Sequence, residues 1–141
     1  MAQQAQPTPT QAVSPLDEAV MYAQYALMMF IVGFLIYMLW GVVDMAAWRD
    51  FVVGGVMMAF AITALISYGF VRPRAYEPLA RGDVATAYQY HVLCLILGFI
   101  FGLGLAGVFL VLAYSRAGVF AMAARAQLAQ APQAGVPQAA P

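Results

Sequence analysis

Two side chains suited to metal or redox chemistry, His91 and Cys94, stand three residues apart in an apolar stretch. That spacing places them on one face of a helix. They would there form half of a metal site, or His91 and one of the nine methionines would hold a haem. A zinc site needs at least three protein ligands, however, and the sequence has no second histidine or cysteine. We therefore predict an interfacial histidine beside a packed thiol, with no metal and no cofactor.

The acidic residues are predicted to lie at helix ends or in loops, not within apolar stretches. They are Asp17, Glu18, Asp44, Asp50, Glu77 and Asp83. Pumps, coupled transporters and many membrane enzymes place ionisable groups inside the membrane. The sequence also lacks a phosphate-binding glycine loop, a nucleophile elbow and a pair of catalytic carboxylates. We therefore predict that the protein is not an enzyme and has no catalytic residue.

The basic residues are six arginines without a single lysine. The codon bias of a GC-rich genome would explain this preference by itself. A functional explanation is that guanidinium groups bind phosphate through a planar fork of donors. The sequence places Arg72, Arg74 and Arg81 together in one connection, so we predict that these three contact lipid headgroups.

Three long apolar runs fill most of the chain. Residues 19–43, 51–71 and 84–115 contain no Asp, Glu, Lys or Arg, and 65% of all residues are hydrophobic while 9% are charged. A helix needs about 20 apolar residues to cross the hydrocarbon core of a bilayer, which is about 30 Å thick. The predicted fold is therefore an all-α, polytopic membrane domain over residues 14–125. Its three transmembrane helices are expected at about 15–43, 51–71 and 84–115.

The ends of these helices carry local start signals. Ser14 is predicted as the N-cap of the first helix, with Asp17 in a capping-box position three residues later, and Asp83 as the N-cap of the third. Residues 44–50 are expected to form an interfacial turn, and residues 72–83 a polar connection after a helix that ends at Arg72-Pro73. The Ala/Gln/Pro-rich segments 1–13 and 126–141 are predicted to be flexible tails.

A stripe of small residues marks the third helix. Gly98, Gly102 and Ala106 follow one another at intervals of four in a GxxxG arrangement, which lets two helix backbones approach closely. The partner would be another helix of the same chain or the same helix of a second copy, and both alternatives stay open. Leu110 is expected to face lipid.

The distribution of arginines does not decide the orientation of a three-span protein. Arg72, Arg74 and Arg81 would share the side of the N-terminus, while Arg49, Arg116 and Arg125 would lie on the other side. Because the first three lie within one short connection, the positive-inside rule favours a cytoplasmic N-terminus and an external C-terminus.

Residues from about 60 to 114 resemble a known family of membrane proteins. They contain ALISYGFVRPRAY, then LARGDVATAY, then a long glycine-rich stretch. This order resembles the interferon-induced transmembrane (dispanin) type, which has a hydrophobic segment, a basic loop with a Gly-Asp-x-x-x-Ala step and a final spanning helix. Here the step is formed by Gly82, Asp83 and Ala87. The resemblance implies an oligomeric protein that shapes membranes or modulates their fusion by stiffening lipid.

The leading functional prediction is a non-catalytic integral membrane protein that acts by helix packing, self-association and lipid contact. Its partners would be membrane lipids and either further copies of itself or a larger membrane complex. One alternative is a structural protein of a virion envelope, and another is an accessory subunit of a redox complex. The net charge of zero argues against nucleic acid as a partner outside the virion alternative.

Overall fold

The computed structural model describes residues 13–130, and within this range every regular element is a helix. Three helical segments are long and apolar enough to cross a membrane: Pro15–Trp48, Phe51–Ala80 and Leu105–Ala129. This confirms the all-α class with three long apolar helices. Most of the two predicted tails lies outside the described residues, but residues 126–130 are helical and not part of a tail.

The first helical segment begins at a cap and runs on past its predicted end. Ser14 is the N-cap of α1 (Pro15–Val43), and its hydroxyl oxygen accepts a hydrogen bond from the backbone N–H of Asp17 at 3.1 Å. The π-helical turn η1 (Asp44–Trp48) continues α1 directly, where a turn was expected. Arg49 ends it in a left-handed conformation, with φ at 56°. Only residues 49 and 50 therefore separate this segment from the next helix.

The second segment also continues beyond its predicted α-helix. Asp50 caps α2 (Phe51–Val71), accepting hydrogen bonds from the N–H groups of Val52 and Val53. The π-helical turn η2 (Arg72–Tyr76) and α3 (Glu77–Ala80) follow without an intervening loop. The predicted end of the second α-helix at Arg72-Pro73 is confirmed, since α2 ends at Val71 with Arg72 as its C-cap, but the polar connection expected after it is mostly helical. Each proline occupies the first turn of its short element, a position that proline favours.

The single helix predicted over residues 84–115 is broken into three pieces. They are α4 (Val84–Gln89), α5 (His91–Phe101) and the first part of α6 (Leu105–Gln130). The break after α5 is sharp, because Leu103 and Gly104 both adopt positive φ, at 57° and 73°. Positive φ is incompatible with a right-handed helix, and glycine adopts it at little cost. The chain therefore turns back, and α5 and α6 form an antiparallel hairpin.

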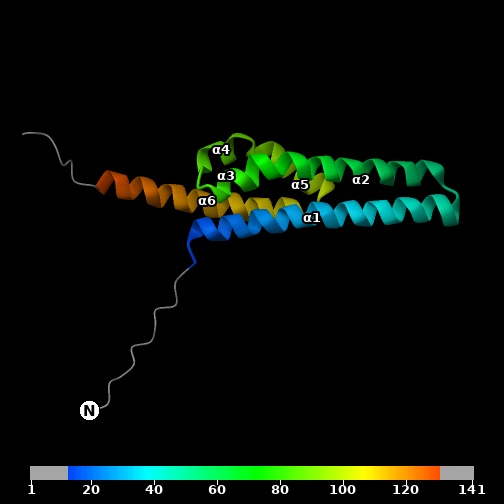
Figure 1. Ribbon diagram of the computed structural model, residues 1–141, viewed down its shortest axis with the longest axis horizontal. Coiled ribbons are helices and arrows are strands. Elements are labelled where there is room, and N and C mark those ends of the chain that lie inside the picture. The colour runs from blue at the N-terminus through cyan, green and yellow to red at the C-terminus, as the bar shows by residue number, and fades with distance from the viewer. Residues whose placement is uncertain (1–12, 131–141) are drawn as a thin grey trace, which may run out of the picture.

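The bundle has two different cross-sections along its length (Figure 1). At the end where α1 begins, α1 packs on both α2 and α6, and α5 fills the space between α2 and α6. At the other end, α1 and α2 continue without α5 and α6. We call the first the wide end and the second the narrow end. The core of the wide end relies on small side chains that bring helices close together: Ala19, Ala23 and Ala26 of α1, and Ala106, Ala113 and Ala117 of α6.

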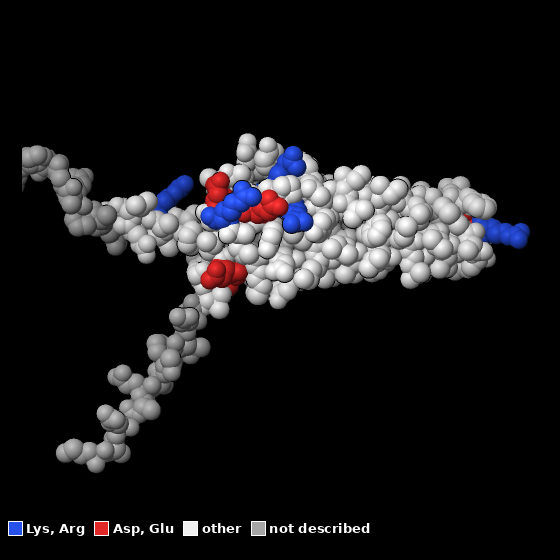
Figure 2. Space-filling model, in the orientation of Figure 1, with Lys and Arg blue, Asp and Glu red and all other residues white. Residues whose placement is uncertain are grey.

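Charged side chains gather at the two ends, and a white band without charge separates them on the visible face (Figure 2). The band consists of apolar side chains, many of them exposed, such as Ile31, Leu35 and Leu39 of α1 and Ile62 and Ile66 of α2. In water such a surface would promote aggregation, so it fits a lipid surrounding.

Candidate functional site

The crossing of α5 and α6 is the closest helix contact built from the predicted small-residue stripe. A Cβ atom added to Gly98 would lie 2.8 Å from the backbone nitrogen of Gly107 and 3.0 Å from a methyl carbon of Leu110. Gly98 therefore serves close packing within the chain. Leu110, expected to face lipid, is completely buried against it.

The other two residues of the stripe, Gly102 and Ala106, do not lie at the crossing, because the stripe is divided between two helices. Gly102 is the C-cap of α5, and Ala106 lies in the first turn of α6. Gly102 accepts a hydrogen bond from the N–H of Ala106 at 3.0 Å, so the two form the tip of the hairpin. The prediction that Gly98, Gly102 and Ala106 share one helix face is wrong for this reason.

The hairpin tip rests midway along α1 and α2. A Cβ atom on Gly33 of α1 would lie 2.9 Å from the carbonyl oxygen of Phe101. The ring of Phe101 packs on Phe60 of α2, with 5.6 Å between centroids. The tip of the hairpin therefore packs on α1 at Gly33 and on α2 at Phe60.

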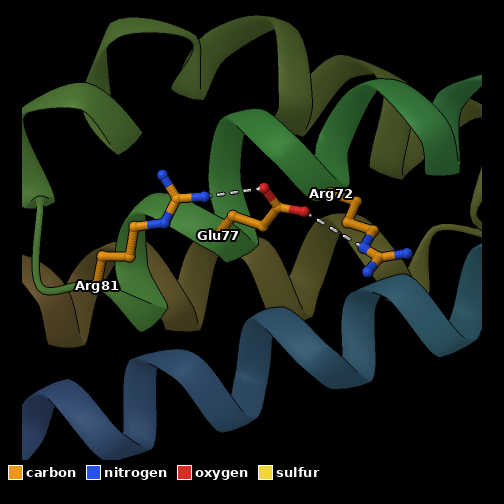
Figure 3. A network of polar contacts seen from close by, with 3 residues as sticks. All are labelled: Arg72, Glu77 and Arg81. Atoms are coloured by element: carbon orange, nitrogen blue, oxygen red, sulfur yellow. Dashed lines mark hydrogen bonds and ion pairs between the residues drawn. The ribbon is translucent and has the colours of Figure 1, made fainter.

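At the wide end, a carboxylate joins two of the predicted headgroup residues (Figure 3). Glu77 Oε1 lies 3.5 Å from Arg72 Nε, and Glu77 Oε2 lies 3.3 Å from Arg81 Nη2. The side chains of Arg72 and Arg81 are 55% and 75% exposed. Ion pairs at such exposure contribute little stability. Their main effect is to hold two guanidinium groups on one carboxylate, which leaves a net positive charge.

Arg74, the third predicted headgroup residue, is held by aromatic rings. Its guanidinium carbon lies 4.0 Å from the ring centre of Phe70 and 5.4 Å from that of Tyr90. These cation–π contacts link the end of α2 to the start of α5. The structure therefore brings Arg72 and Arg81 into one network and places Arg74 in a separate contact.

Two of the three arginines expected on the opposite side, Arg116 and Arg125, lie at the wide end as well. Arg116 Nε is 3.0 Å from Glu18 Oε2, which fixes α6 against the first turn of α1. Arg125 lies farther along α6, where it lines a groove with Val84 and Ala85 of α4. The predicted tie in the arginine count is therefore wrong: five arginines lie at the wide end, and Arg49 lies at the narrow end. Because α6 runs back, it ends at the end of the bundle where α1 begins and not at the opposite end (Figure 1).

Two hollows open at the wide end. The larger, of about 400 Å³, lies between α4 and α6 and is almost entirely apolar except for Arg125. The smaller, of about 300 Å³, lies between α1 and the α2–η2 segment. It is lined by Gln24, Leu27, Met28, Ile31, Tyr68, Arg72 and Tyr76. We call this smaller hollow the Arg72 cleft.

His91 and Cys94 lie on neighbouring turns at the start of α5, where they take part in hydrogen bonding and core packing. The Nδ1–H of His91 donates to the carbonyl oxygen of Tyr88, with 2.6 Å between the heavy atoms. The hydroxyl of Tyr88 donates to the carbonyl oxygen of Tyr114 on α6. Cys94 is completely buried in the core of the wide end. Within residues 13–130, no group of three or more His, Cys, Asp or Glu side chains is placed to hold a metal ion.

Asp83 lies between the short helices α3 and α4. Its carboxylate accepts hydrogen bonds from the hydroxyl of Thr86, at 2.6 Å, and from the backbone N–H of Thr86, at 3.1 Å. These bonds lower the pKa of Asp83, because they favour the charged carboxylate. Asp83 therefore acts as the N-cap of α4, and the preceding Gly82 turns the chain with φ at 76°.

Asp44 is the polar residue that the sequence interpretation misplaced. The sequence predicts an interfacial turn at this position, but Asp44 is only 1% exposed in η1. Neither carboxylate oxygen has a hydrogen-bond partner among the described residues. The reason is that η1 prolongs α1, which keeps residue 44 on the face toward α2, where nearby Gly41 and Met45 contact Gly54.

We expect Asp44→Ala to stabilise the protein against thermal unfolding in detergent by about 1–3 kcal/mol, because it removes two buried oxygen atoms that have no hydrogen-bond partner among the described residues. Asp50→Ala provides the contrast. It should destabilise the protein by about 0.5–2 kcal/mol, because it removes the cap of α2. A loss of stability in Asp44→Ala would show that the carboxylate has a stabilising partner in the folded protein.

Comparisons with protein-family models, curated protein sequences and solved structures find no match to this chain.

Proposed function

We propose that this protein is a non-catalytic integral membrane protein that shapes the bilayer by occupying more area in one leaflet than in the other. The observation that carries the proposal is the α5–α6 hairpin, which packs beside α1 and α2 only at the wide end (Figure 1). With 11 residues, α5 is about 17 Å long, roughly half of the hydrocarbon thickness. It is therefore too short to cross the membrane. The longer α6 begins at the hairpin tip, reaches the level of the first turn of α1 at Arg116 and continues beyond the start of α1 (Figure 1), so only its first part would lie in the hydrocarbon core.

The charged side chains at the two ends of the bundle support a position in which the bundle spans the membrane. The ion pair between Glu18 and Arg116 and the Glu77 network mark one boundary. Asp50 and Arg49, together with the edge-to-face pair of Trp40 and Trp48, mark the other. The 21 residues of α2 between these boundaries span about 31 Å, which matches the hydrocarbon core. The positive-inside rule then puts the five arginines of the wide end in the cytoplasm.

The wide end has a larger cross-section than the narrow end because it contains two further helices. A helix with its side chains is about 10–12 Å across, so two further helices add about 200 Å² to the cross-section of the wide half. Lipids of that leaflet are displaced, while the lipids beneath the hairpin tip stay in place. A bilayer with unequal areas in its two leaflets bends toward the leaflet with less area. We infer that the protein favours curved membranes in which the leaflet at its narrow end is the concave one and the leaflet at its wide end is the convex one.

This proposal agrees with what the family resemblance implies, namely membrane shaping by a small helical protein. It includes lipid contact and intramolecular helix packing, and self-association stays a prediction. The virion envelope protein and the redox accessory subunit stay predictions as well. The tapered cross-section favours membrane shaping over both.

The proposal is tested by the orientation of the protein in vesicles of different size. Gln127→Cys and Arg49→Cys, each in a Cys94→Ser background, report the wide and the narrow end. In small sonicated vesicles the outer leaflet has excess area, so Gln127→Cys should react with an impermeant maleimide from outside in a clear majority of molecules. In large extruded vesicles the fraction should approach one half. Arg49→Cys should show the mirror-image dependence.

An outside-labelled fraction that is independent of vesicle size at both positions would overturn the proposal. A dependence with the opposite sign would also overturn it, because the wide end would then prefer the crowded inner leaflet. Labelling after detergent addition normalises each sample to the total number of reactive thiols.

A further inference from the structure

The Arg72 cleft has a polarity that changes along the axis of the bundle. On α1, Gln24 lies toward the wide end, and Leu27, Met28 and Ile31 follow one or two turns deeper. On the antiparallel α2–η2 segment, Arg72 and Tyr76 lie at the same outer level, as shown by their place near the end of that segment. The cleft is therefore polar at its mouth and apolar in its depth.

The apolar part of the cleft faces the side where lipid would be. Met28 is 47% exposed and Ile31 is 42% exposed, so the floor of the cleft is continuous with the outer apolar surface of α1. An occupant with a hydrocarbon tail would bury these side chains without entering the core. A small soluble anion would leave them uncovered.

Arg72 is positioned to bind a phosphate at the mouth. Its Nε is directed to Glu77, as Figure 3 shows, and its two terminal nitrogens have no hydrogen-bond partner among residues 13–130. Two terminal N–H groups of a guanidinium match two phosphate oxygens. Glu77 also pairs with Arg81, so the network of two arginines and one glutamate keeps a net positive charge beside the cleft.

We propose that the Arg72 cleft is a binding site for an anionic phospholipid, with the phosphate on Arg72 and an acyl chain along Leu27, Met28 and Ile31. The inference rests on the proposed function in one respect, which is that the wide end lies at the level of lipid headgroups. It names the lipid that would hold the protein in that leaflet. The charge at the mouth, the apolar floor and their order along the membrane normal all match one lipid molecule.

The test is native mass spectrometry of the detergent-purified protein with added phosphatidylglycerol. Diacylglycerol, with the same tails and no phosphate, and glycerol phosphate, with no tails, are the comparison probes. Phosphatidylglycerol should bind at least tenfold more tightly than either. Arg72→Gln should weaken phosphatidylglycerol binding by about 10- to 100-fold, as expected for the loss of a hydrogen-bonded charged contact. Arg49→Gln, at the narrow end, is the matched control and should bind as the wild type does.

A second variant tests the apolar part separately. Met28→Trp should block the floor of the cleft and reduce phosphatidylglycerol binding without a change of charge. Unchanged thermal unfolding of each variant verifies that the fold is retained. The proposal would be overturned if Arg72→Gln and Arg49→Gln weakened phosphatidylglycerol binding equally. It would also be overturned if diacylglycerol bound as tightly as phosphatidylglycerol, or if glycerol phosphate displaced the bound phosphatidylglycerol. Because binding is measured in detergent, it can fail while the curvature experiment succeeds, and the reverse also holds.

Discussion

Gly98→Ala is expected to destabilise the protein by about 1–3 kcal/mol, although alanine is the better helix former by nearly 1 kcal/mol. The new methyl group would lie 2.8 Å from the nitrogen and 2.9 Å from the Cα of Gly107. Both are backbone atoms, so the clash cannot be relieved by rotating a side chain. The α5 and α6 helices would have to move apart, and the tip of the hairpin would shift with them.

Gly69→Ala is the matched control. Gly69 lies within α2, where an added Cβ meets no atom within 4 Å, so the substitution should stabilise the helix by up to about 1 kcal/mol. The opposite signs of the two changes are measured by thermal unfolding in the same detergent. A stabilising Gly98→Ala would show that α5 and α6 do not cross at this residue.

Leu110→Ala is expected to destabilise the protein by about 2–5 kcal/mol. Leu110 is completely buried, and one of its methyl carbons approaches the position that a Cβ on Gly98 would take. Removing the side chain leaves a cavity enclosed by α5 and α6, which lipid cannot reach. The loss therefore comes from missing packing contacts, which operate equally in a membrane.

Val111→Ala, one residue farther along α6, is the comparison for this prediction. Val111 is 45% exposed, and in a bilayer its surface would contact lipid in place of protein. We expect a change of less than about 1 kcal/mol, because no closed cavity forms. Equal stability of Leu110→Ala and Val111→Ala in detergent would place residue 110 on the lipid side, as the sequence alone suggested.

The first half of the fold was predictable because its signals are local. The charge-free runs predict the bounds of α1 and α2, and capping by Ser14 and Asp83 depends on residues within one turn. The length of an uncharged run indicates whether the segment can span the hydrocarbon core. A cap satisfies N–H groups only two or three residues away. Neither signal needs knowledge of the tertiary structure.

The hairpin was not predicted, because its glycines are compatible with two different structures. The sequence Gly102-Leu103-Gly104 interrupts residues 84–115, but glycines four apart also indicate close helix packing. The left-handed Leu103 is held by its contacts, with its side chain packed near Gly33 of α1. A long-range contact of this kind decides between a straight helix and a turn, and no local pattern contains it.

Asp44 was misplaced for a related reason. A charged residue after an apolar run usually marks the end of a spanning helix, so the sequence DMAAWRD predicts a turn. The helix continues through η1, since the close contact between Gly41 and Gly54 keeps α1 and α2 together up to this point. The burial of Asp44 follows from that packing and not from its own chemistry.

We propose that both ends of the described chain lie on one side of the membrane, because the chain turns back at the hairpin tip. Cysteine labelling in intact and permeabilised cells tests it most directly, with Val13→Cys, Arg49→Cys and Gln127→Cys, each in a Cys94→Ser background. Positions 13 and 127 should react with an impermeant maleimide only after permeabilisation, while position 49 should react in intact cells. Labelling of positions 13 and 127 from opposite sides would show that α6 crosses the membrane as a third complete span.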